Sequence, residues 1–210
     1  MVRNSVQGTV TAVLAAVSVA VTGCTSSAQD DDGKAAPKPR AAAESAMKGA
    51  SVGGSGSACA LPVTFDLAAS WKPEAVQVIE DDALSDLGKQ GPVTLVCEID
   101  AKPAGNIGFL RVWTGDRTDD TARQVLKAFL AADPNAAEAT YTDVKAGSLT
   151  AAEVGYTVSS ELLDEPKKER AFAVSTPSGP VVVHLGGLDS QEHEEMLPAY
   201  ELAKRSVRLG

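Results

Sequence analysis

Side chains that could take part in catalysis or bind a metal are few in this sequence. It contains two histidines, His184 and His193, and three cysteines. The stretch "QEHEEM" around His193 is rich in carboxylates but lacks the HExxH spacing that brings two histidines to one zinc ion. The chain has no G-x-S-x-G and no C-x-x-C motif. The sequence therefore predicts no catalytic residue, no metal ligand and no cofactor.

The two histidines are each better explained by structure than by catalysis. His184 lies in "VVVHLGG" near the end of an apolar run, which is typical of a partly buried histidine in a strand. His193 has acidic neighbours and is expected on a solvated, charged helix face. The alternative function is an envelope hydrolase or metal-dependent enzyme that uses His184, and it requires a carboxylate within hydrogen-bond reach of that ring.

The first cysteine, Cys24, closes the segment Val21-Thr22-Gly23-Cys24. Arg3 and an uncharged run from Thr9 to Val21 precede it, and this run is shorter than the roughly 20 residues that span a membrane. The four-residue segment resembles the bacterial lipobox. That resemblance implies a signal peptide over 1–23, cleavage before Cys24, and palmitate-type acyl chains on the new N-terminal cysteine. Two such chains anchor a protein stably, so we expect the cell membrane, on its extracytoplasmic face.

The other two cysteines, Cys59 and Cys97, are expected to form a disulfide, because exported domains are often cross-linked in this way. The alternative is a pair of free thiols, one in a core strand and one at the end of the linker. The formal net charge of −9 disfavours nucleic acid and anionic lipid headgroups, which require clustered basic residues.

The composition divides the chain into three parts. After the signal peptide, residues 24–58 consist mainly of Ala, Gly, Ser, Pro and charged residues, which is typical of a disordered tether. Residues 59–210 contain the apolar patterns of one folded extracytoplasmic domain of ordinary size.

Within that domain, apolar alternation and turn residues predict strands separated by two main helices. The strands are expected at 61–67, 75–79, 93–99, 107–113, 141–145, 151–159, 171–176 and 180–185, the last two joined by a turn at Pro177-Ser178-Gly179. A short helix is expected near 81–91, capped by Asp81 or Asp82. Trp71 and Trp113 are expected to pack in the core or at an edge.

The first main helix is expected between 119 and 133, with Asp119 or Asp120 as its N-cap. The last helix is expected after Asp189 or Ser190, but Pro198 is costly in a helix interior, so its regular part is predicted to start near Leu197. The predicted fold class is α+β, with a mostly antiparallel sheet.

Several stretches together resemble actinobacterial lipoproteins with a PsbP-like domain, the LpqN type. They are the lipobox, the tether, "FDLAASWKP" near the domain start, a Tyr-centred strand, the Thr-Pro-Ser-Gly hairpin and a last helix ending in "SVRL". The resemblance implies a non-catalytic binding or scaffold protein of the envelope, with an envelope protein or a small apolar ligand as its partner. A purely structural or regulatory subunit, which would have no ligand pocket, is the remaining alternative.

Overall fold

The computed structural model describes residues 47–77, 88–161 and 163–210, and its centre is an eight-stranded sheet. The strand order is β3-β5-β6-β10-β9-β8-β7, with β4 paired to β5. Every pairing between these strands is antiparallel. The strands are β3 (Lys72–Ala75), β4 (Lys89–Gln90), β5 (Val93–Asp100), β6 (Phe109–Thr114), β7 (Ala136–Ala146), β8 (Leu149–Val158), β9 (Lys167–Thr176) and β10 (Gly179–Gly186).

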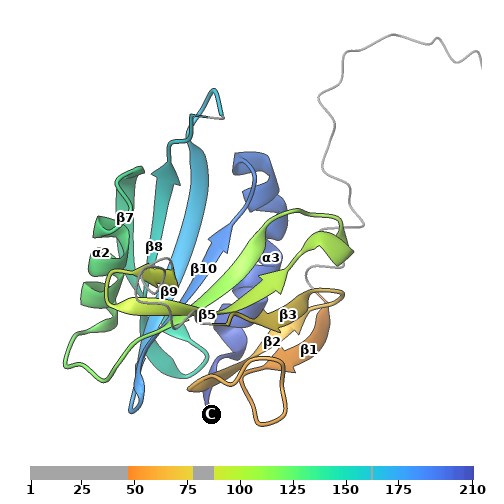
Figure 1. The fold of residues 1–210 in the computed structure, drawn as a ribbon, viewed down its shortest axis with the longest axis vertical. Coiled ribbons are helices and arrows are strands. Elements are labelled where there is room, and N and C mark those ends of the chain that lie inside the picture. The colour runs from red at the N-terminus through yellow and green to blue at the C-terminus, as the bar shows by residue number, and fades with distance from the viewer. Residues whose placement is uncertain (1–46, 78–87, 162) are drawn as a thin grey trace, which may run out of the picture. The chain divides into compact units, whose positions relative to one another are not determined.

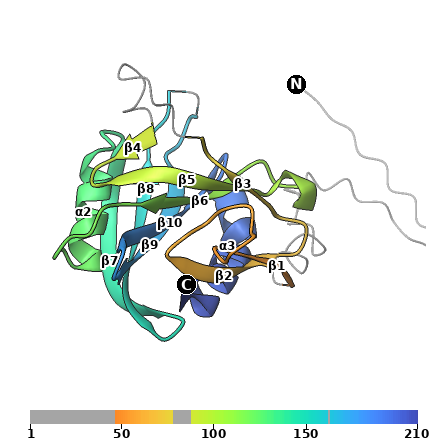
Figure 2. The same ribbon diagram turned by 60° about the horizontal axis from the view of Figure 1, so that its bottom comes forward.

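A helix covers each face of this sheet, α2 (Ala122–Ala131) on one and α3 (Ser190–Ser206) on the other (Figure 1, Figure 2). Alternate residues along the strands point to opposite faces and separate the core into two clusters. Ala152, Val154, Ala171, Ala173 and Val182 pack with α2, on what we call the α2 face. Ala151, Phe172, Val174, Val181 and Val183 pack with α3, on the α3 face. The predicted α+β fold with a mostly antiparallel sheet is confirmed.

A small sheet joins the core on the α3 face. It consists of β1 (Lys48–Val52), β2 (Val63–Ala68) and β11 (Arg208–Leu209), and its Phe65 and Leu67 belong to the same cluster as α3. The short 3-10 helix η2 (Lys102–Ala104) lies between β5 and β6. Among the described residues no helix is long and apolar enough to cross a membrane.

The predicted disulfide between Cys59 and Cys97 is present, with 5.9 Å between the two Cα atoms. Cys59 precedes β2, and Cys97 lies in the middle of β5. Both cysteines are buried, so the bond connects the small sheet to the large one within the core.

The ordered domain begins earlier than the predicted boundary at residue 59. Strand β1 falls inside the predicted tether, because it pairs antiparallel with β2 and places Val52 in the core. This segment has the composition of a linker, and only its long-range pairing makes it a strand. Residues 24–46 of the predicted tether lie outside the described residues, as does the signal peptide.

The last helix was predicted wrongly at its start. Helix α3 runs without interruption from Ser190 to Ser206 with Pro198 inside it, and Asp189 is its N-cap, as expected. The proline removes one backbone hydrogen bond. Burial of Met196 before it and Tyr200 after it against the sheet holds the helix together across that position.

Two other local predictions also change. The N-cap of α2 is Thr121, which forms a capping box with Gln124, in place of Asp119 or Asp120. Strand β3 ends at Ala75, where the sequence pattern predicted a strand to begin. Asp81, Asp82 and most of the predicted short helix lie outside the described residues, and the end of that stretch forms β4.

Gly147, in the turn between β7 and β8, allows the C-terminal end of α3 to approach closely. Its φ is +55°, and an added Cβ would lie 1.9 Å from the carbonyl oxygen of Val207. We expect Gly147→Ala to lower the free energy of unfolding by about 2 kcal/mol. Gly155→Ala in β8, where nothing lies within 4 Å of the added methyl, should change it by less than about 0.5 kcal/mol. Urea unfolding of both variants measures this, and equal effects would contradict the prediction.

Candidate functional site

A pocket of about 260 Å³ opens on the α2 face, beside the C-terminal end of α2. Residues from β4, β5, β6, β8, β9 and β10 and from the turn after α2 form its walls. They are Gln90, Leu95, Arg111, Trp113, Asp133, Tyr156, Glu169 and His184. Ligand sites are typically concave surfaces with a few convergent polar groups, so this is the candidate functional site.

Strand register brings the polar residues of the pocket together. Arg111 on β6 lies directly opposite His184 on β10, and Tyr156 on β8 lies directly opposite Glu169 on β9. Side chains opposite each other on one face of an antiparallel pair are within contact distance. Four neighbouring strands of the sheet therefore each supply one polar side chain to the same region.

Glu169 is the centre of a buried hydrogen-bond network. Its Oε2 lies 2.8 Å from Nε2 of His184 and accepts a hydrogen bond from the hydroxyl of Tyr156 at 3.1 Å. Its Oε1 forms a 2.8 Å ion pair with Nζ of Lys167. Glu169 and His184 are each only 7% exposed. A buried carboxylate is stable only when it is paired and hydrogen-bonded, and this network supplies both conditions.

The electrostatics of the network keep Glu169 ionised. Burial alone would raise the pKa of its carboxyl group, but the charge and hydrogen bonds of His184 and Lys167 outweigh burial and lower the pKa to about 2. Burial and the adjacent Glu169 carboxylate raise the pKa of the Tyr156 hydroxyl far above its usual value. At neutral pH Tyr156 is therefore a hydrogen-bond donor and Glu169 an acceptor.

Gly186 on β10 lies next to three of these groups. A Cβ atom at this position would lie 3.0 Å from Cε1 of His184, 3.5 Å from Oε1 of Glu169 and 3.7 Å from Nη1 of Arg111. Three polar side chains therefore lie next to residue 186, and a methyl group there would force the His184 ring to shift by a few tenths of an ångström.

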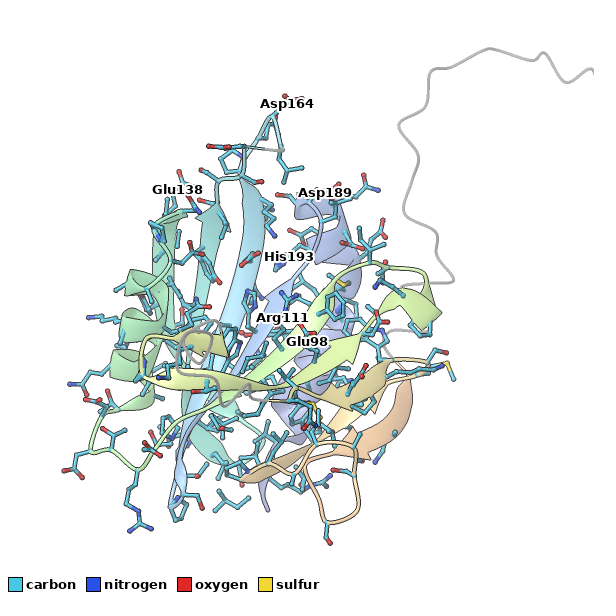
Figure 3. The ribbon with its side chains drawn as sticks, viewed as in Figure 1. Glu98, Arg111, Glu138, Asp164, Asp189 and His193 are labelled. Atoms are coloured by element: carbon cyan, nitrogen blue, oxygen red, sulfur yellow. A yellow bond between two sulfur atoms is a disulfide. The ribbon has the colours of Figure 1, made fainter. Side chains whose placement is uncertain are left out.

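Arg111 is oriented by its neighbours on the sheet. Its Nε donates to Oε1 of Glu98 on β5 at 2.7 Å, and its guanidinium lies 5.0 Å from the ring centre of Phe109. Figure 3 shows Glu98 and Arg111 beside each other on adjacent strands. The two terminal nitrogens of Arg111 have no hydrogen-bond partner in the described part of the chain.

The pocket wall offers hydrogen-bonding groups but no hydroxyl or thiol nucleophile among its described residues, apart from the Tyr156 hydroxyl, which Glu169 holds. Residues 47–77, 88–161 and 163–210 contain no cluster of three His, Cys, Asp or Glu side chains placed to hold a metal ion. The polar side chains of the pocket wall are suited to forming hydrogen bonds with a small molecule.

His184 was expected to be a partly buried strand histidine, and it is buried on β10. It also lies within hydrogen-bond distance of a carboxylate and lines a pocket. These are the features that the alternative enzymatic function requires, so that function stays a proposal.

His193 is not on a solvated face, in contrast to the prediction. It is 2% exposed, and burial lowers its pKa to about 4. Because α3 starts at Ser190, His193 lies on the same inward face as Met196 and Tyr200, three and seven positions later. Its Nδ1 has no hydrogen-bond partner in the described structure. Figure 3 labels it on α3.

The other candidates from the sequence are placed as follows. Trp71 and Trp113 are both buried in the core, as expected. Cys59 and Cys97 are bonded to each other and do not belong to the pocket. The lipobox residues Val21, Thr22, Gly23 and Cys24 lie outside the described residues.

Sequence reasoning missed Glu169, Arg111, Tyr156 and Lys167. One signal for Glu169 was available, because it alternates with Ala171 and Ala173 in "KKERAFAV" and so shares their inward direction. A glutamate at an inward strand position requires buried partners. Nothing in the local sequence indicates that Arg111 and Tyr156 lie beside it.

The model of a family described as an uncharacterised lipoprotein matches residues 29–207. No curated protein matches the chain.

Proposed function

Because the chain belongs to this family of uncharacterised lipoproteins, we propose that it is a non-catalytic binding protein of the cell envelope. In this proposal a lipid on Cys24 anchors it to the extracytoplasmic face of the membrane after removal of residues 1–23. The pocket at His184 holds a small ligand. The antiparallel sheet with a final helix supports assigning the domain to the PsbP-like type of actinobacterial lipoproteins.

The observation that carries a binding role is the state of Glu169. Its two oxygens already accept from His184, Tyr156 and Lys167, so the carboxylate is fixed as a structural charge and has little freedom to move protons. A rigid polar wall of this kind orients a ligand at small entropic cost. The charged lining favours a ligand with a polar group over the purely apolar one that the family resemblance implies.

A hydrolase that uses His184 is the second candidate function. The 2.8 Å contact between His184 and Glu169 is the geometry of a base held by a carboxylate. Such an enzyme would need water or a substrate group as its nucleophile, because no Ser, Thr or Cys lines the described pocket. Product formation in the ligand experiment described below would favour this candidate over simple binding.

The anchor is tested by Cys24→Ala. We expect the native protein in the membrane fraction, with a mature chain that begins at Cys24 and carries acyl mass. The variant should lose that mass and leave the membrane fraction, because without acyl chains no stable attachment remains. Intact mass and fractionation measure both properties. Thr25→Ala keeps the thiol and is the control, and a native chain without acyl mass would contradict the prediction.

Binding is tested by recovering what the protein carries. The lipoprotein is purified from membranes in mild detergent, incubated with a small-molecule extract of the envelope, washed and denatured, and the released compounds are identified by mass spectrometry. A compound retained unchanged by the native protein and lost in Gly186→Ala supports the proposal. Gly155→Ala, whose added methyl meets nothing within 4 Å, is the matched control. If the native protein retains no compound at a higher level than Gly186→Ala does, the proposal is overturned.

A further inference from the structure

We propose that the pocket recognises the carboxylate of a small organic acid, and that the guanidinium of Arg111 is the group that binds it. This inference rests on the proposed function, because it assigns a ligand class to the same pocket. It depends on three features of the described residues: the orientation of Arg111, the charged and polar groups around it and the burial of the nearby aromatic rings.

Arg111 is presented in the geometry that carboxylates require. The ion pair with Glu98 uses Nε, and the guanidinium lies over the ring of Phe109, so among the described residues neither terminal nitrogen has a hydrogen-bond partner. Nη1 points toward the space above Gly186. A guanidinium offers parallel N–H donors that match the two oxygens of a carboxylate, and prior orientation reduces the entropy lost on binding.

Glu169 does not take the place of that ligand. Lys167 and His184 pair with its two oxygens, and it forms no ion pair with Arg111 among the described residues. Trp113 adds a second unmet donor beside the pocket, since its buried Nε1 has no hydrogen-bond partner in the described structure. A buried donor without an acceptor is unfavourable, so the surroundings favour an incoming group that accepts hydrogen bonds.

Two other ligand classes fit the pocket less well. A sugar would stack on an open aromatic face, but Trp113 and Tyr156 in the pocket wall are only 8% and 5% exposed. A phosphate dianion would bring a second negative charge close to Asp133 and Glu169, which line the same pocket. A carboxylate brings half the charge of the dianion, and its two oxygens match the terminal nitrogens of Arg111 that the ion pair with Glu98 does not use.

The remainder of the ligand is expected to be small and largely apolar. Leu95 and the ring of Trp113 form the non-polar part of the wall. The volume of about 260 Å³ is slightly below the roughly 300 Å³ at which drug-sized sites begin. Short aliphatic acids and benzoate match both properties.

The two tryptophans provide an internal control for the test. Trp113 lines the pocket, whereas Trp71 lies in the cluster of the α3 face, and neither indole N–H group has a hydrogen-bond partner among the residues that the structure describes. The full mature lipoprotein, labelled with ¹⁵N-tryptophan and held in detergent micelles, should show one indole signal for each. Trp113→Phe assigns them. We titrate with acetate, butyrate and benzoate, with benzamide as the neutral analogue, and with inorganic phosphate.

We expect at least one of the acids to shift the Trp113 signal saturably and to leave the Trp71 signal in place, while benzamide shifts neither. Arg111→Lys keeps the charge but loses the planar pair of donors, and should weaken acid binding about tenfold. Arg123→Lys, which changes an arginine paired with Asp143 on β7, should bind as the native protein does. An unmoved Trp71 signal in Arg111→Lys shows that the variant is folded.

Each contrary result has a separate meaning. Equal shifts with benzoate and benzamide, or a shift with phosphate alone, would overturn the carboxylate assignment and leave the binding pocket in place. Acid binding that is unchanged in Arg111→Lys would overturn the role of Arg111. No shift with any acid overturns the inference, and if the envelope extract also yields no retained compound, the proposed function fails with it.

Discussion

Glu169→Gln is expected to lower the free energy of unfolding by about 3 kcal/mol at pH 7. The variant keeps the size of the side chain and removes its charge, so Lys167 loses its ion pair and His184 its carboxylate partner. Removing one member of a buried charged network is costly because the other members stay buried without compensation. Urea unfolding of the native protein and the variant, monitored by tryptophan fluorescence, measures the difference.

The pH dependence of this difference follows from the direction of the pKa shift. The pKa of Glu169 is lowered in the folded state from 4.5 to about 2. A group with a depressed pKa stabilises the fold fully above its unfolded-state pKa, and that stabilisation is lost as the pH falls toward the folded-state value. The difference in the free energy of unfolding between the native protein and Glu169→Gln should therefore have its full value at pH 6. It should decrease below about pH 4.5 and be small near pH 2.

Glu194→Gln is the matched control for this prediction. Glu194 forms an ion pair with Lys168 of similar length, 2.8 Å, but the two side chains are 52% and 57% exposed. Exposed pairs contribute less than about 1 kcal/mol. If the two variants lost equal stability, or if the Glu169→Gln gap did not change between pH 6 and pH 3, the buried network would not have the role assigned to it.

Loss of the Cys59–Cys97 disulfide is expected to have the largest effect on stability. The bond closes a loop with a sequence separation of 38, for which the chain-entropy model gives about 4 kcal/mol. For a domain of this size that corresponds to a fall of roughly 10 °C in the melting temperature. The loss acts on the junction between the small and the large sheet, because Cys59 precedes β2 and Cys97 lies in β5.

Calorimetry of the native protein and of the Cys59→Ala/Cys97→Ala double variant measures this effect, each with and without a reductant. The reductant should lower the melting temperature of the native protein toward that of the double variant and leave the double variant unchanged. A native protein whose thiols become titratable in reductant without any change in melting temperature would contradict the prediction.

Much of the secondary structure could be predicted from local pattern. Strands β5 and β6, the hairpin of β9 and β10, and helix α2 all lie where alternation, helical spacing and turn residues indicated them. Each of these elements buries its own apolar residues at the period that its conformation requires. In these segments the local sequence pattern and the tertiary packing favour the same conformation, so the local pattern is enough to predict it.

The prediction failed where packing opposed the local signal. β1 has the composition of a linker and is a strand because β2 lies beside it. Helix α3 passes through Pro198 because burial on both sides offsets the lost hydrogen bond, and the same continuity makes His193 a buried residue. In each case the energy that decides the outcome comes from contacts with distant segments.

The sequence by itself determined the features that depend on neighbouring residues. These are the lipobox-like segment at Cys24, the α+β class, the position of α2, and the cysteines available for a cross-link once Cys24 is set aside. Only the tertiary structure decided that Glu169, His184, Arg111 and Tyr156 form one site. Their meeting depends on the register of four strands and on which face each residue occupies. Register is set by burial of both sheet faces along the whole chain, and no short stretch of sequence contains that information.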